Sequence, residues 1–154
     1  MKYLSNNFNV SMLKEEGIDH SIKIKTMSIQ EVKRRLSDIE GYESLINDYD
    51  SASILSEKLD ICIPVGKDLK DFTPYDTLII AQPKDIIEVD QLKDKSMRFN
   101  MLELNAMWKV DYYSIDRKLL KEITLGNLSY SEAKKEAILA GVRIPYDIYD
   151  IYHI

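Results

Sequence analysis

The sequence predicts an α+β fold, with a single mixed β-sheet flanked by helices and a helical, tyrosine-rich C-terminal extension. Short apolar or alternating segments, which are typical of strands, are interspersed with segments that carry helix-capping signals. The 154 residues suit one domain with a terminal appendage, and they suffice to bury a full core. We therefore expect a main domain over 1–115 and an extension over 116–154, packed on that domain or on a dimer partner.

The first half of the chain alternates strand and helix signals. Strands are expected at 3–4, 21–26, 61–65 and 77–81, the last being the most apolar short run and hence central. Helices are expected at 14–17, at 28–39 and at 51–59. The second of these helices starts with Ser28 and Glu31 in a capping box, and the third is capped by Asp50. Pro83 ends the central strand.

The second half is less regular. The segment 101–108 is compatible with a helix, 109–115 alternates as a strand, and 116–126 is expected to be helical in part. Ser129 and Glu132 form another capping box, and the helix that follows ends at Gly141. The tail repeats a tripeptide three times, with Tyr146, Tyr149 and Tyr152 spaced three apart.

Composition excludes several classes of function. A net charge of -5 attracts no long nucleic acid. The single Cys62 excludes an internal disulfide and fits a reducing compartment, and its apolar neighbours predict a buried, inert thiol. The two histidines, His20 and His153, lack metal-ligand spacing, and the five glycines form no phosphate-binding loop. From this we expect neither a metal nor a cofactor. No apolar run reaches membrane-spanning length, so we expect a cytoplasmic protein.

The opening stretch is dense in small hydrogen-bonding side chains. Ser5, Asn6, Asn7, Asn9 and Ser11 surround the apolar Phe8 and precede Met12 and Leu13. Such residues at the end of a strand turn the chain or cap a helix. They also suit a pocket wall that offers amides, hydroxyls and a helix N-terminus to a polar or anionic ligand. The residues alone leave both interpretations open.

The tyrosine-rich tail also has more than one interpretation. Its rings can pack onto the sheet or onto a second subunit, where tyrosine is favoured. They can instead form a platform on which nucleobases stack.

The opening motif resembles a known family. Tyr3-Leu4-Ser5-Asn6-x-Phe8-x-x-x-Met12-Leu13 is similar to the start of the viral ring nucleases, small dimeric anti-CRISPR proteins of archaeal viruses and phages. Further blocks agree in order and spacing over residues 1–115. Tyr49-Asp50-Ser51-Ala52 looks like the family's Gly-His-Asp-Ser-Thr helix start, 76–82 like its Gly-Asp-x-Leu-x-Val-x-Gln strand, and 109–114 like its closing strand.

The resemblance implies a ligand, namely the cyclic tetra-adenylate messenger of type III CRISPR systems, held in a pocket across a homodimer. It implies ring cleavage without metal, in which a ribose 2′-hydroxyl attacks the adjacent phosphate and a histidine protonates the leaving oxygen. The positions that it marks for ligand contact are Asn6, Asn9, Ser11, Asp50, Ser51 and Gln82. Lys67, Lys84 and Arg98 are candidates for the family's arginine contacts.

The chain departs from the family at the acid. Tyr49 stands where the family has its histidine, and Asp48 stands where it has glycine. A phenol is a poorer proton donor at neutral pH than an imidazolium, and a carboxylate repels phosphate.

Three functions follow as hypotheses. The first is a viral or mobile-element anti-defence protein of the host cytosol that binds and sequesters a cyclic nucleotide messenger. The second is a metal-independent ring nuclease in which Tyr49 is the acid. The third is an inhibitor that binds a host defence protein through its acidic surface and tyrosine tail.

Overall fold

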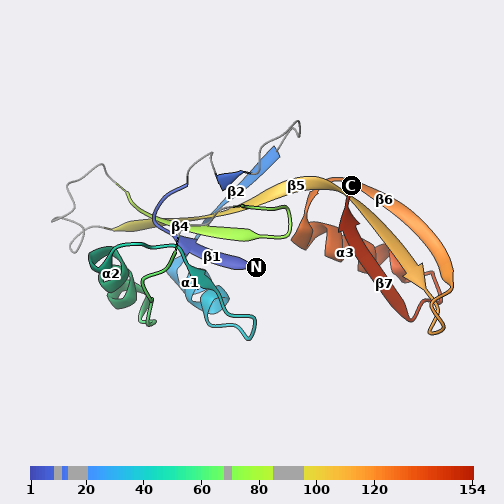
Figure 1. The fold of residues 1–154 in the computed structure, drawn as a ribbon, viewed down its shortest axis with the longest axis horizontal. Helices are drawn as coiled ribbons and strands as arrows, with labels where there is room; N and C mark the ends of the chain where they lie inside the picture. Colours follow the sequence, from blue (N-terminus) through green and yellow to red (C-terminus); the bar gives the residue numbers. More distant parts are fainter. Residues whose placement is uncertain (9–11, 14–20, 68–70, 85–95) are drawn as a thin grey trace.

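The computed structural model describes residues 1–8, 12–13, 21–67, 71–84 and 96–154, and it confirms an α+β fold with one mixed sheet (Figure 1). Within these residues, the sheet has seven strands: β1 Lys2–Ser5, β2 Ser21–Met27, β3 Glu43–Ser44, β4 Thr77–Pro83, β5 Met97–Tyr113, β6 Leu119–Ser129 and β7 Ile148–His153. The helices are α1 Ile29–Leu36, α2 Tyr49–Leu59 and α3 Tyr130–Gly141.

The strand order places β1, β3 and β4 side by side. The main path is β2-β5-β4-β1-β3, and β6 and β7 pair with β5 beyond it. Strand β1 is parallel to both β3 and β4, whereas β5 is antiparallel to all four of its partners. The carboxyl ends of β1, β3 and β4 therefore meet at one edge of the sheet. The expected central strand at 77–81 is confirmed as β4.

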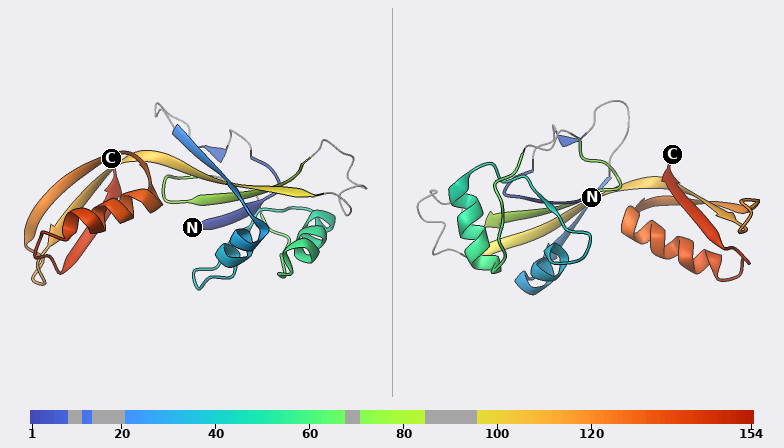
Figure 2. Two further views of the ribbon diagram at one scale, coloured as in Figure 1. Left: turned by 180° about the vertical axis from the view of Figure 1, so that it is seen from behind. Right: turned by 60° about the horizontal axis from the view of Figure 1, so that its bottom comes forward.

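Strand β5 connects two lobes. Its first half pairs with β2 and β4, and its second half pairs with β6 and β7. Asn105 marks the change, since it lies opposite Ser21 of β2 and Ser129 of β6. We call residues 1–105 the N-terminal lobe and residues 106–154 the C-terminal lobe. Figures 1 and 2 show the long strand running through both lobes.

Both faces of the N-terminal sheet are buried. On the face covered by α1 and α2, the core includes Leu4, Val32, Leu55, Ile79 and Phe99. On the opposite face a second cluster of buried residues comprises Leu45, Phe72, Leu78, Ile80, Leu102 and Leu104, against which Phe8, Met12 and Leu13 pack. Burial on both faces removes the polar alternation that usually marks a strand.

That loss explains one wrong prediction. The segment 101–108 is compatible with a helix in its sequence pattern, but it lies in the middle of β5. Met101 faces the helices while Leu102 and Leu104 face the other way, so both sides of the strand read as apolar. The predicted strand at 61–65 is also wrong, since no strand forms there. In this segment only the side chain of Ile63 is buried, and its neighbours Cys62 and Pro64 are exposed.

Helix boundaries are set by caps. Ser28 caps α1 and Ser129 caps α3 as predicted, the latter in a complete capping box with Glu132. Helix α2 is capped by Asp48 rather than by the expected Asp50. The Asp48 side chain accepts a hydrogen bond from the Ser51 backbone amide at 2.7 Å. Helix α1 ends at Leu36, so the predicted extension to residue 39 is wrong and Ile39 is fully exposed.

The C-terminal lobe contains strands as well as a helix. The segment 116–126, expected to be helical in part, forms the β5–β6 turn and most of β6. Arg117 adopts a left-handed backbone with φ 63° in this turn. Helix α3 packs on one face of the β5–β6–β7 sheet, where the Tyr112 hydroxyl donates to the Ala137 carbonyl at 2.6 Å. Burial raises the pKa of the Tyr112 phenol.

The tail forms strand β7, Ile148–His153, so the tyrosines of its threefold repeat do not share one face. Side chains three apart in a strand point to opposite faces because the strand repeats every two residues. Tyr149 lies opposite Tyr112 on the face covered by α3, and Tyr146 also packs there. Tyr152 lies opposite Lys109 on the other face. The tail thus packs on its own sheet, one of the alternatives that the sequence left open.

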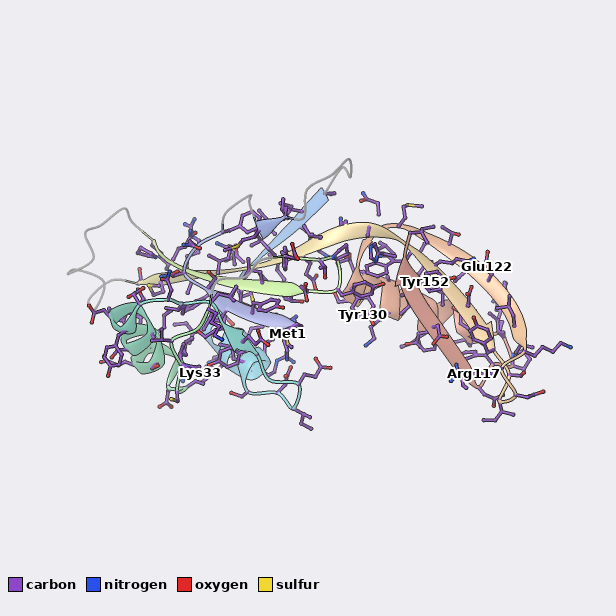
Figure 3. All side chains as sticks on the ribbon, viewed as in Figure 1. Met1, Lys33, Arg117, Glu122, Tyr130 and Tyr152 are labelled. Carbon is purple, nitrogen blue, oxygen red and sulfur yellow. The ribbon has the colours of Figure 1, made fainter. Side chains whose placement is uncertain are left out.

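An aromatic cluster joins the two lobes. Tyr75, from the loop before β4, lies 5.1 to 5.2 Å from the rings of Trp108, Tyr130 and His153. Its hydroxyl accepts the His153 amide at 3.0 Å. Figure 3 labels Tyr130 at this junction. In the part of the chain that the structure describes, no helix has both the length and the apolar character needed to cross a membrane.

Candidate functional site

The candidate site lies at the edge where β1, β3 and β4 end. Side chains that follow parallel strands gather at such an edge, where ligands bind in open sheets. Strand β1 ends at the fully buried Ser5, whose hydroxyl accepts the Asn7 amide at 3.2 Å. This bond turns the chain immediately after the strand, so the opening stretch does form the polar turn that its composition indicated.

Asn6 reaches from this turn to the start of α2. Its side-chain amide donates to Asp48 Oδ2 at 3.5 Å, while Asp48 Oδ1 accepts the Ser51 amide. The contact spans 42 residues of sequence. It brings together the opening Asn/Ser motif and the start of the second motif, 49–52.

The N-terminus of α2 is electrostatically mixed. A helix N-terminus attracts anions, because its first amides point outward and the helix dipole is positive there. In this chain the Asp48 carboxylate already accepts one of those amides, and Asp50 adds a second carboxylate in the first turn. Tyr49 lies beside them with 77% of its surface exposed. Its side chain therefore projects into solvent from the first turn.

Lys67 is positioned by the preceding residue, Gly66, whose structural role no motif in the sequence marks. The Gly66 amide donates to the Ile46 carbonyl at 2.8 Å. A Cβ on Gly66 would lie 1.4 Å from the Ser44 carbonyl oxygen, so only glycine fits against the end of β3. The exposed Lys67 follows directly and lies at the same sheet edge. A lone glycine after an apolar run was the available signal.

Gln82 and Arg98 belong to the other face of the sheet. They lie opposite each other in the β4–β5 register, and both are exposed. Since Leu78 and Ile80 face away from α1 and α2, the alternation of β4 places Gln82 on that face too. Lys84 follows β4, and its amide donates to the Ser96 carbonyl at 3.0 Å.

The structure thus forms two groups of predicted site residues. Asn6, Asp50, Ser51 and Tyr49 lie together on the helix-covered side of the edge. Gln82 and Arg98 lie on the opposite side, so a ligand that contacts both groups must wrap around the sheet edge. Asn9 and Ser11 lie outside the described residues, as does His20.

The remaining reactive side chains lie away from this edge or do not suit its chemistry. His153 belongs to the aromatic cluster of its own C-terminal lobe. The prediction of a buried Cys62 is wrong: the thiol is exposed, because its segment is not part of the sheet. Among the described residues, no group of three His, Cys, Asp or Glu side chains is arranged to hold a metal ion.

Comparison with known proteins gives a likeness of fold. The chain is similar in structure to B116 of Sulfolobus turreted icosahedral virus, with a TM-score of 0.54 and 16% sequence identity. The match covers 66% of this chain and 97% of B116. No protein-family model and no curated protein sequence matches the chain.

Proposed function

We propose that the N-terminal lobe binds a cyclic oligonucleotide messenger and holds it intact, as a viral anti-defence protein would do to silence an immune signal. The contact from Asn6 to Asp48 carries the proposal, because it unites the two motif blocks that resemble those of the viral ring nucleases. A fold like that of a viral protein, B116, supports the viral role. By the same resemblance, two copies of the chain share one ring.

The polar groups at the edge suit a nucleotide. The amide of Asn6 and the hydroxyl of Ser51 can exchange hydrogen bonds with ribose or base, and Lys67 supplies a cation for phosphate. A ring ligand that wraps around the edge would also reach Arg98 on the opposite face. Binding energy therefore has identifiable sources on both sides of the sheet.

The same edge is poorly arranged for cutting. A general acid must lie within hydrogen-bond reach of the leaving oxygen, in a fixed orientation. Tyr49 is exposed on the first turn of α2, and its hydroxyl makes no hydrogen bond to another described residue that would orient it. Asp48 and Asp50 add negative charge where a phosphorane-like transition state would gain more. These features favour holding the ring over cleaving it.

Titration calorimetry with cyclic tetra-adenylate and related cyclic nucleotides tests the proposal. We expect binding with one ring per two chains, and chromatography of the denatured complex should return the ring intact. Linear products that vanish in Tyr49→Phe would establish a nuclease instead. No binding to any member of the panel would remove the function altogether.

A matched pair of variants tests the site. Asn6→Ala removes the amide at the edge, and we expect affinity to fall about 2-fold to 10-fold, as for a hydrogen bond to a neutral group. Gln30→Ala removes an exposed amide from α1 and should leave affinity unchanged. Equal behaviour of the two variants would place the ligand elsewhere.

A further inference from the structure

The C-terminal sheet has one face that no described element covers. Helix α3 packs against the face formed by Trp108, Val110 and Tyr112. Because a strand alternates, Lys109, Asp111 and Tyr113 point to the opposite face. Figure 3 shows Tyr152 of β7 and Glu122 of β6 in the same lobe, on the strands that flank β5. We call this surface the outer face.

Three carboxylates form a row across the outer face. Asp111 of β5 lies opposite Glu122 of β6 on one side and opposite Asp150 of β7 on the other. Like charges directly opposite in a sheet repel each other. Lys109 pairs with Glu122 at 2.5 Å, which compensates one of the three charges. The row retains two negative charges without a cation from its own strands.

Asp111 is incompletely satisfied although it is 93% buried, with 7% of its surface exposed. Its Oδ2 accepts the hydroxyls of Tyr152 at 2.8 Å and Tyr113 at 3.3 Å. Its Oδ1 has no hydrogen-bond partner among the described residues. A buried carboxylate oxygen without a donor is costly, so Asp111 Oδ1 requires a donor that the described residues do not supply, either water or a bound group.

The two tyrosines complete the chemistry of the outer face. The hydrogen bond to Asp111 raises the pKa of the Tyr152 phenol, and burial followed by the charge of Asp111 raises that of Tyr113. Both hydroxyls therefore stay protonated as donors. The Lys109 ammonium already lies 5.9 Å from the centre of the Tyr152 ring, so this ring accepts a cation on its face.

We propose that the outer face binds an arginine side chain of a protein partner. A guanidinium is planar, stacks on tyrosine rings and donates to two carboxylate oxygens at once, which matches an acidic row flanked by tyrosines. It can pair directly with the exposed Asp150 carboxylate, and it donates to the buried Asp111 Oδ1 once neighbouring side chains move aside. Apolar Leu119 and Ile148 lie opposite Tyr113 and provide a rim for the rest of the partner. The acidic row repels nucleic acid.

Binding of a labelled hexa-arginine peptide to the full chain, followed by fluorescence anisotropy, tests this proposal. We expect Asp111→Asn to weaken binding at least 10-fold, since it removes the central charge while retaining an acceptor for the tyrosine hydroxyls. Glu136→Gln removes an exposed carboxylate from α3, outside the acidic row, and should leave binding unchanged. A hexa-lysine peptide should bind more weakly than hexa-arginine.

Two results would overturn the proposal. One is an equal loss in Asp111→Asn and Glu136→Gln, which would show attraction to overall charge only. The other is unchanged binding in Asp111→Asn. If that variant does not fold, Asp150→Asn at the exposed end of the row replaces it, and at least a threefold loss is expected. Cyclic nucleotide binding should survive in both variants, so this proposal and the one for the N-terminal lobe fail independently.

Discussion

Replacing Asp48 separates its two roles at the start of α2. Asp48→Ala removes the cap on the Ser51 amide, which lies at 2.7 Å, and we expect it to cost about 1 kcal/mol of the free energy of unfolding. For a chain of this length, that corresponds to a fall in Tm of about 2–4 °C. Asp48→Asn retains a capping acceptor and should lose only the interaction of the charge with the helix dipole, about 0.3–1 kcal/mol.

The effect on ligand affinity has the opposite sign. A phosphate held by the first turn of α2 would lie roughly 5 Å from the Asp48 carboxylate. Their repulsion is then about 0.8 kcal/mol in bulk water and about 3 kcal/mol at an effective dielectric constant of about 20. Asp48→Asn should therefore bind cyclic tetra-adenylate about fourfold to 200-fold more tightly than the unchanged chain. The gain should shrink as salt is raised, because salt screens exposed charges.

Calorimetric titration at low and high salt, together with thermal unfolding of the same samples, measures both effects. Asp60→Asn is a suitable control, because it removes one carboxylate at the far end of the same helix. If Asp48→Asn stays folded but binds no more tightly than the unchanged chain, no phosphate lies at the start of α2. The placement of the ligand at this edge would then be refuted.

Three further predictions concern stability. Gly66→Ala should lower the free energy of unfolding by more than about 3 kcal/mol or prevent folding, because its Cβ would overlap the β3 backbone. Gly126→Ala should be tolerated, since the nearest atom to its Cβ is 3.5 Å away. Urea unfolding compares the stabilities of the two variants. Tyr75→Ala should loosen the aromatic cluster and lower the free energy of unfolding by about 2–4 kcal/mol. It should also shift the fluorescence emission of Trp108, the single tryptophan, to the red. Unchanged emission would show that the lobes are joined by other contacts. The hydrogen bond from Lys23 and then those from Ser129 lower the pKa of Glu132 below its ordinary value of 4.5, so the stability it contributes is present above about pH 4.5 and is lost as the pH falls through the lowered pKa. Urea unfolding between pH 7 and pH 3 should show a smaller acid-induced loss in Glu132→Gln than in the unchanged chain, and parallel losses would contradict this assignment.

Local signals predicted much of the N-terminal lobe. The apolar run of β4, the alternation of β2 and the cap at Ser28 each depend on neighbours in sequence, so they could be recognised without a fold. Strand β5 could not be recognised in the same way. Its side chains are buried by different partners on its two faces and along its two halves, and those partners are distant in sequence.

The candidate site was predictable only in part. The dense polar stretch at the N-terminus and the block at 49–52 were visible as motifs, but nothing in the sequence indicated that Asn6 would contact Asp48. Gln82 and Arg98 lie on the other face from Asn6, because side chains along β4 alternate between the face that the helices cover and the face that they do not cover. That relation exists only once the helices are packed.

The sequence by itself determined the fold class, the cap of α3 and the surplus of negative charge, because these follow from composition and from interactions within a few residues. The tertiary structure decided the register. Pairing set Asp111 between Glu122 and Asp150, and it sent Tyr149 and Tyr152 to opposite faces of the sheet. The opening stretch forms a turn that also brings Asn6 to Asp48, because the parallel pairing of β1 and β3 ends beside α2. Long-range pairing is chosen by the burial of whole faces, which no local pattern encodes.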